Sequence, residues 1–114
     1  MTPSDRRQHF RLVYPLRARP TLVLPSGEVQ VTDVSETGLR FWARDPHLFI
    51  AGDEIDGTLL LPHKRGMFHI HGHVVRHEPS GAVAVHLAPH CELPFALIMS
   101  EQRALIQLGM LKSY

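Results

Sequence analysis

Hydrophobic and polar residues alternate along most of the chain, in short runs that end at proline or glycine. Alternation of this kind has the period of a β-strand with one buried face. It predicts strands over residues 16–24, 28–33, 39–42, 54–61, 67–77 and 82–87. Pro25-Ser26-Gly27 and Glu78-Pro79-Ser80-Gly81 are typical hairpin turns. Strands spaced at about ten residues indicate a small antiparallel barrel or sandwich.

The last part of the chain has a different period. Residues 95–108 place five apolar side chains on one face of a helix: Leu97, Ile98, Ala104, Leu105 and Leu108. Pro94 suits the start of this helix, and Gly109 suits its end. We therefore expect a single C-terminal helix that plugs or flanks the β-domain.

The length and composition are those of one small globular domain. A chain of 114 residues is long enough for a single core, and a net charge of +1 predicts no particular partner. The single cysteine, Cys91, cannot form an intramolecular disulfide and fits a reducing compartment. The N-terminus lacks the apolar core of a secretory signal, and no apolar run approaches the ~20 residues that span a bilayer. We therefore expect a cytoplasmic domain without membrane insertion.

Two short polar segments carry the candidate chemistry. Residues 1–14 are polar and basic, and we interpret them as an arm that contains Arg6, Arg7 and Arg11. Residues 33–38 form an Asp-Val-Ser-Glu-Thr-Gly turn between two predicted strands. Alone, the arm is typical of a solvated tail. The turn alone is typical of an ordinary loop, because Asp and Ser hydrogen-bond their own backbone.

Together, the two segments suit a ligand that carries both phosphates and purine rings. Arginine presents planar, forked donors that match phosphate oxygens and stack on flat rings, so Arg7 and Arg11 can reach two sides of one ligand. The carboxylate of Asp33 can accept hydrogen bonds from a purine edge. Ser35 can bond a phosphate or its own turn. Gly38 permits a positive φ and a close approach of the ligand to the main chain.

The order and spacing of these residues resemble the PilZ domain family, the bacterial receptors for cyclic di-GMP. That family carries Arg-x-x-x-Arg before its first strand and (Asp/Asn)-x-Ser-x-x-Gly in the following turn. Here all five defining positions match, as Arg7, Arg11, Asp33, Ser35 and Gly38. Residues 72–76, Gly-His-Val-Val-Arg, resemble the family's Gly-x-Val-Val-Arg strand. The chain departs from the family in its sixth strand, where Ala82, Ala84 and Leu87 stand at positions in which glycine and an aromatic residue are common.

The resemblance implies a mainly all-β fold, a small six-stranded antiparallel β-barrel with one C-terminal α-helix. It implies a single PilZ-like domain over residues 1–114. The ligand-clamping arm would occupy residues 1–14, the barrel residues 15–88 and the helix residues 94–109. It also implies a receptor that is not an enzyme, with no catalytic residues, no cofactor and no metal.

The same resemblance assigns roles within the ligand site. Arg7 and Arg11 would contact the phosphates and guanine faces of cyclic di-GMP. The guanine edges would be contacted, and backbone contacts provided, by Asp33, Ser35 and Gly38. Arg6 is the position that the family links to stoichiometry, and an arginine there favours two stacked cyclic di-GMP molecules per domain. Two additional candidates, on a strand that belongs to the barrel in this family, are His73 and Arg76.

The expected function is that of a cyclic di-GMP sensor whose arm is mobile without ligand and ordered with it. It would signal to an unidentified protein effector in the control of motility, pili or exopolysaccharide. The alternative is an adaptor of the same fold that binds its partner without a ligand. We expect no binding to a nucleic acid polymer, because Arg17 and Arg19 have no interleaved aromatic platform. The sequence leaves a homodimer open.

A metal site on the alternating residues His69, His71 and His73 is the main rival. Alternate strand positions project to one face, and neutral imidazoles suit zinc or copper. Alternate residues lie ~6.6 Å apart, however, so three in a row cannot easily ligate one tetrahedral ion. We favour a polar outer face of a half-buried strand. Cys91, beside His90, is interpreted as a free thiol rather than a nucleophile.

Overall fold

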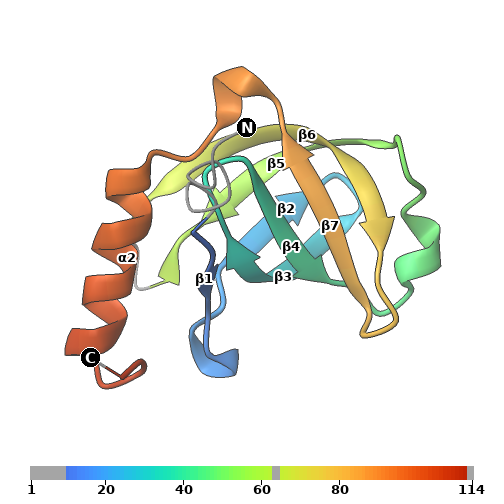
Figure 1. Ribbon diagram of the computed structural model, residues 1–114. Helices are drawn as coiled ribbons and strands as arrows, with labels where there is room; N and C mark the ends of the chain where they lie inside the picture. The colour runs from blue at the N-terminus through green and yellow to red at the C-terminus, as the bar shows by residue number, and fades with distance from the viewer. Residues whose placement is uncertain (1–9, 63–64, 113–114) are drawn as a thin grey trace, which may run out of the picture.

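A closed β-barrel forms the body of the molecule, and one helix lies against its side (Figure 1). The computed structural model describes residues 10–62 and 65–112. The barrel contains β2 (Thr21–Leu24), β3 (Gly27–Val34), β4 (Gly38–Trp42), β5 (Glu54–Leu60), β6 (Met67–His77) and β7 (Ala82–Leu87). They pair antiparallel in the order β3-β2-β5-β6-β7-β4, and the β3–β4 pairing closes the ring. This confirms the six-stranded antiparallel barrel and the C-terminal helix.

The alternating pattern located strands β3 to β7 to within one residue at each end. The predicted hairpin turn between β2 and β3 is present, with Leu24 paired to Gly27. Gly27 has a φ of 133°, a value that favours glycine because no Cβ clashes with the backbone. The β6–β7 hairpin is closed by the N–H group of Gly81, which donates to the carbonyl oxygen of Glu78 at 3.0 Å.

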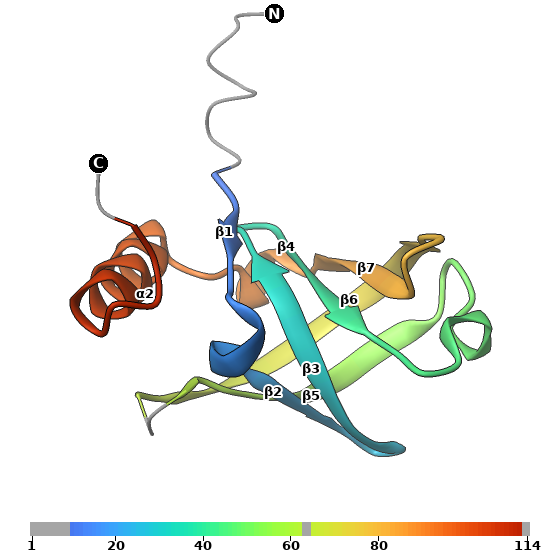
Figure 2. The ribbon, with the colours of Figure 1, turned by 90° about the horizontal axis from the view of Figure 1, so that it is seen from below.

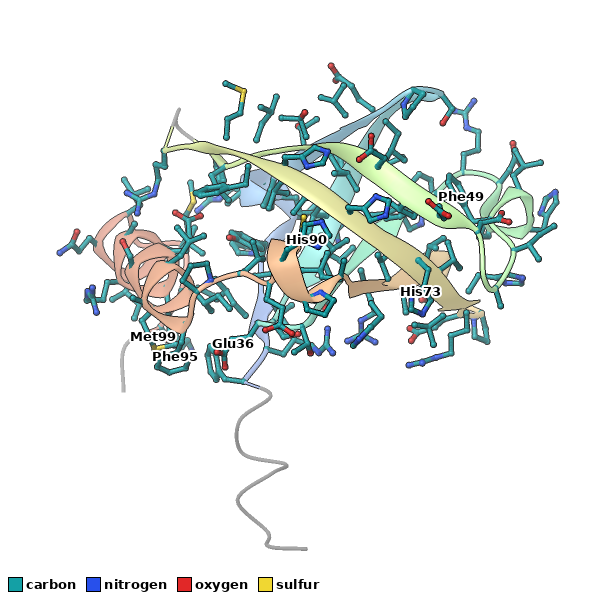
Figure 3. The ribbon with its side chains drawn as sticks, turned by 90° about the horizontal axis from the view of Figure 1, so that it is seen from above. Glu36, Phe49, His73, His90, Phe95 and Met99 are labelled. Carbon is teal, nitrogen blue, oxygen red and sulfur yellow. The ribbon has the colours of Figure 1, made fainter. Side chains whose placement is uncertain are left out.

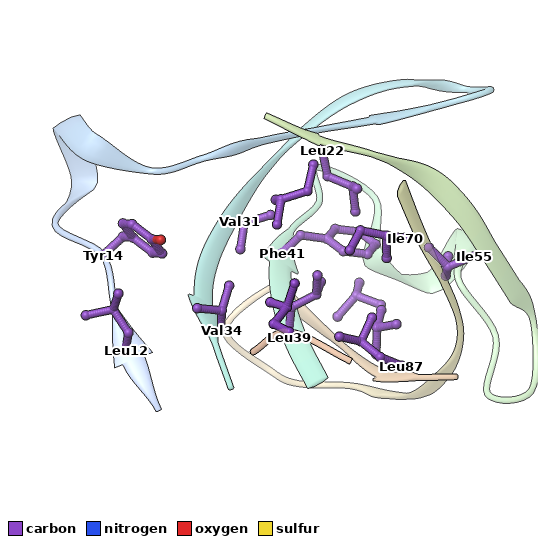
Figure 4. Packing of buried hydrophobic residues seen from close by; sticks show 14 of the residues in the cluster. Leu12, Tyr14, Leu22, Val31, Val34, Leu39, Phe41, Ile55, Ile70 and Leu87 are labelled. Carbon is purple, nitrogen blue, oxygen red and sulfur yellow. The ribbon is translucent and has the colours of Figure 1, made fainter. Parts of the chain in front are cut away.

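Inward side chains from every barrel strand fill the interior. Phe41 is fully buried at the centre, and its ring meets the edge of the Phe49 ring with centroids 5.0 Å apart. Around it pack aliphatic residues that include Leu22, Val31, Leu39, Ile70 and Leu87 (Figure 4). Each fully buried side chain of this size contributes about 1.5–3 kcal/mol. The sum of these terms makes the barrel interior the main source of stability.

The start of the chain is attached to the barrel further upstream than predicted. Leu12–Val13 forms a short strand, β1, which pairs antiparallel with Asp33 and Val34 of β3. Leu12 and Tyr14 are buried and lie beside Val34 (Figure 4). The expected arm over residues 1–14 therefore ends before Leu12, because the apolar residues at its end join the core. Residues 1–9 lie outside the described residues.

The strand predicted over residues 16–24 is wrong in its first half. Leu16–Ala18 forms a 3₁₀ turn, η1, and only Thr21–Leu24 is a strand. Leu16, expected on the buried face, is 70% exposed. Pro15 and Pro20 flank the turn, and neither has an N–H group to donate to a neighbouring strand. The chain therefore leaves β3 after β1 and rejoins it at β2.

Helix α2 (Phe95–Gln107) flanks the barrel on the side of β1, as two perpendicular views show (Figure 1, Figure 2). Ile98 and Leu105 are buried on its inner side. Pro94 is the N-cap residue, and Gly109, with a φ of 73°, follows the C-cap, as the sequence predicts. Leu108 was expected on the buried face but is 52% exposed, because it is the C-cap residue and lies outside the helical period.

Candidate functional site

A β-bulge in β3 brings the Asp33 side chain out of the barrel core. The pairing of β3 with β4 shifts register between Val31 and Asp33. Val31 and Val34 both belong to the core although they are three residues apart. In a regular strand Asp33 would point inward with Val31. The extra residue of the bulge is therefore what places the carboxylate outside the core.

Asp33 is only 5% exposed, because other polar side chains cover it. Arg11 Nη1 donates to Oδ1, and Arg40 Nε donates to both carboxylate oxygens at 3.1 Å. The Thr32 hydroxyl donates to Oδ2 at 2.9 Å. Charge-assisted hydrogen bonds of this kind compensate the desolvation of a buried carboxylate. Arg11 of the basic segment and Asp33 of the turn thus contact each other directly.

Arg40 connects Asp33 to a second carboxylate, that of Glu78. Its Nη1 atom donates to Oε1 and Oε2 of Glu78 at 3.2 and 3.1 Å, and Arg76 Nη2 donates to Oε2 at 3.2 Å. Desolvation acts to lower the pKa of Arg40, but the hydrogen bonds and charges of Asp33 and Glu78 outweigh it and raise the pKa. Arg40 therefore stays protonated within a continuous chain of arginine and carboxylate groups.

The turn between β3 and β4 is closed by Ser35. Its N–H group donates to the Gly38 carbonyl oxygen at 2.8 Å, and its Oγ accepts from the Gly38 N–H group at 3.1 Å. Ser35 is 2% exposed, so its hydroxyl fixes the turn. Gly38 does not adopt the positive φ that a glycine permits. A Cβ here would instead lie 2.8 Å from the carbonyl oxygen of Val85, so the close approach of β7 is what requires glycine.

A shallow, mainly polar groove of about 150 Å³ opens beside this turn. Arg11, Ser35, Gly38 and Arg40 contribute to its lining from the β1, β3 and β4 region, and Arg76 and His86 contribute from β6 and β7. Small-molecule pockets usually measure ~300–1,000 Å³. The groove can therefore seat only part of a ligand as large as a dinucleotide.

Five of the predicted site residues gather at or beneath this groove: Arg11, Asp33, Ser35, Gly38 and Arg76. Arg6 and Arg7 lie outside the described residues. His73 does not line the groove. Its ring packs against that of His86, with centroids 5.5 Å apart, and His86 is the histidine that reaches the groove.

Sequence reasoning missed Arg40 and Glu78. One signal was present, because alternation with the buried residues Leu39 and Phe41 places Arg40 on the outer face of β4. Its partners were not predictable from that pattern. They depend on the pairing of β4 with both β3 and β7, which brings Asp33 and the β6–β7 hairpin to opposite sides of Arg40.

The alternating histidines of β6 point away from the core and pair with neighbouring side chains. His69 Nε2 lies 2.7 Å from Asp56 Oδ1, and the His71 ring stacks on His90 with centroids 6.1 Å apart. Figure 3 shows His73 on β6 and His90 on the short turn that follows β7. Within residues 10–62 and 65–112, no group of three or more His, Cys, Asp or Glu side chains is placed to hold a metal ion. The observed contacts are those of a polar outer face.

Comparison with known proteins completes the description of the site. No helix in the described part of the chain is long and apolar enough to cross a membrane. A search of curated protein sequences finds no match. A search of protein families matches the PilZ domain over residues 5–108, which is nearly the whole chain. This match agrees with the closed barrel and with the contact between Arg11 and Asp33. The chain belongs to the PilZ domain family, a family of cyclic di-GMP receptor domains and not of enzymes.

Proposed function

We propose that this domain binds cyclic di-GMP at the groove beside Asp33 and Gly38. The observation that carries the proposal is the ion pair between Arg11 and Asp33, which are 22 positions apart in the sequence. One residue comes from each of the two segments that resemble the family's motifs. The fold therefore joins the two motifs in one place.

Ligand binding would exchange one set of partners for another. The phosphate oxygens of cyclic di-GMP compete with Asp33 for Arg11, because both are anionic acceptors that match a guanidinium group. Asp33, once released, accepts hydrogen bonds from the N–H groups of a guanine edge. Ser35 and Gly38 contribute by fixing the turn that presents this carboxylate.

The remaining ligand surface needs further contacts, because the groove is small. We assign these to Arg6 and Arg7, which precede Arg11 in the sequence. An arginine at position 6 favours two stacked ligand molecules per domain. Arg76 lies at the groove and can reach a phosphate, and His73 contributes through its contact with the His86 ring.

Rearrangement of the residues before Leu12 would then change the surface near α2. A protein effector in the control of motility, pili or exopolysaccharide would recognise that change in the cytoplasm. In the alternative adaptor function, the effector would bind the same surface when no ligand is present. Titration with cyclic di-GMP separates the two functions.

Isothermal titration calorimetry with cyclic di-GMP tests the proposal. We expect a dissociation constant of about 1 μM or tighter, with one or two ligands per chain. Arg11→Ala should weaken binding by about tenfold or more, because it removes a charge-assisted contact worth roughly 1.5–3 kcal/mol. Arg17→Ala, an exposed arginine on η1 outside the groove, is the matched control and should bind like the wild type. No heat from the folded wild type at millimolar ligand would refute the proposal.

A further inference from the structure

Glu78 is a carboxylate held in a fixed position at the edge of the candidate site. It follows β6 directly and begins the hairpin to β7. Its N–H group donates to the Ala82 carbonyl oxygen at 2.7 Å, and its own carbonyl oxygen accepts from Gly81. Its side chain is 22% exposed. The backbone bonds therefore fix where this side chain begins, and its hydrogen bonds to arginines orient the carboxylate.

Among the residues that the structure describes, this carboxylate accepts hydrogen bonds only from arginines at the groove. Both oxygens accept from Arg40, and one of them also accepts from Arg76. With Arg11 and Asp33, the cluster holds three guanidinium groups and two carboxylates, and so carries one net positive charge. Removal of the Glu78 charge would double the positive charge that faces an anionic ligand.

The ion pairs that Glu78 makes with Arg40 and Arg76 contribute less to the stability of the fold than the buried pairs of Asp33 do. The Arg40 side chain is 28% exposed, and the Arg76 side chain is 61% exposed. Ion pairs in such positions are screened by solvent and have small effects on stability. The pairs therefore have more influence on what the arginines can bind than on whether the barrel folds.

We propose that Glu78 sets the affinity of the site by occupying Arg40 and Arg76 in the unliganded domain. A carboxylate and a phosphate present similar forked oxygen acceptors to a guanidinium group. Glu78 thus stands where a ligand phosphate would stand, and the ligand must displace it to reach these arginines. This inference rests on the proposed binding of cyclic di-GMP and adds the residue that opposes it.

Glu78→Gln tests the inference, because it removes the charge and keeps the shape. We expect cyclic di-GMP to bind about two- to fivefold more tightly in calorimetry, the effect of releasing a partly exposed ion pair. Glu28→Gln makes the same charge change near the start of β3, at the end opposite to Asp33, and should leave the affinity unchanged. In an Arg40→Gln background, the gain from Glu78→Gln should shrink, because the two residues act on each other. Glu78→Ala is a second variant, and thermal unfolding verifies that each protein is folded.

The outcomes distinguish this inference from the proposed function. Tighter binding by Glu78→Gln than by the wild type, with Glu28→Gln unchanged, supports the role of Glu78. If the wild type binds and both folded Glu78 variants bind equally or more weakly, the role of Glu78 is wrong and the proposed function stands. If neither the wild type nor the variants bind at millimolar cyclic di-GMP, both are wrong.

Discussion

At the scale of single residues, the unliganded domain does not offer Asp33 as a vacant acceptor. Its carboxylate is buried and accepts from Arg11, Arg40 and Thr32. A ligand that uses Asp33 must therefore replace at least one of these donors. The net binding energy is then the difference between two sets of charge-assisted hydrogen bonds, and a nearby charge such as Glu78 is therefore expected to affect the affinity measurably.

Gly38→Ala should destabilise the fold by about 1–3 kcal/mol, the usual cost of inserting an extra methyl group into a packed site. The added Cβ would lie 2.8 Å from the backbone oxygen of Val85, which cannot move without disturbing the β4–β7 pairing. Chemical denaturation measures the effect. Gly109→Asn is the contrasting control, because Gly109 has a φ of 73°, a Cβ added there would meet no atom within 4 Å, and asparagine tolerates that conformation. A Gly38→Ala variant as stable as the wild type would contradict this account.

At the scale of elements, Tyr14 connects three separate parts of the chain. Its hydroxyl donates to Glu101 Oε1 on α2 at 3.0 Å, and the other oxygen of Glu101 accepts from Arg65, which precedes β6. Glu101 is 2% exposed, so this buried carboxylate depends on both partners. The network fixes α2 against the barrel and against the segment after β1. Tyr14 is therefore expected to stay in place, and any movement of the N-terminal segment is expected in the residues that precede Leu12.

The Tyr14 hydroxyl should make stability depend on pH in the alkaline range. Burial, together with the charge and hydrogen bond of Glu101, raises the pKa of Tyr14 well above its usual value of about 10. The folded protein therefore keeps a proton that the unfolded chain loses. The stabilising term is complete below pH 10 and falls above it by about 1.4 kcal/mol per pH unit.

Urea denaturation of the wild type and Tyr14→Phe between pH 7 and 11 measures this term. Near neutral pH the variant should be less stable by about 1.5–3 kcal/mol, the contribution of a hydrogen bond to a charged group. The gap between the two proteins should narrow by about 1.4 kcal/mol between pH 10 and pH 11, because phenylalanine has no proton to lose. A gap that stays constant up to pH 11 would show that Tyr14 ionises as easily in the folded protein as in the unfolded chain.

At the scale of the whole molecule, charge is unevenly distributed although the net charge is only +1. Arg11, Arg40 and Arg76 gather around one groove, where their positive charge exceeds that of the two carboxylates that hold them. The closed barrel supplies a rigid support for this cluster, because each strand is paired on both sides. In the proposed function, ligand binding would therefore change the contacts of this cluster and the segment before Leu12, while the barrel remains the same.

A ligand that binds only the folded domain should raise the unfolding temperature of the whole molecule. At a free cyclic di-GMP concentration 100 times the dissociation constant, the stabilisation is about 2.7 kcal/mol. For a domain of this size that corresponds to an increase of about 10 °C. Differential scanning calorimetry measures it, and Arg11→Ala should lose about half of the shift or more at the same ligand concentration. An equal shift in both proteins would place the ligand away from Arg11.

The sequence by itself determined the elements and half of the site. Alternation with period two is a local property, so β3 to β7 were located from it directly. The helical spacing of apolar residues, with a proline and a glycine at the ends of the helix, predicted α2 in the same way. The motif positions Arg11, Asp33, Ser35 and Gly38 were identified from their resemblance to the motifs of the family. Local patterns failed at residues 16–18, where two prolines interrupt a run that otherwise resembles a strand.

Only the tertiary structure decided how these residues act together. The bulge that turns Asp33 outward, the approach of β7 that requires a glycine at position 38, and the meeting of Arg40 with Glu78 all depend on strands that pair across long distances in sequence. Pairing is determined by closure of the barrel and by the fit of its core, which no short segment contains. The sequence therefore identified the residues of a candidate binding site, and the closed barrel determined which of their charges already have partners.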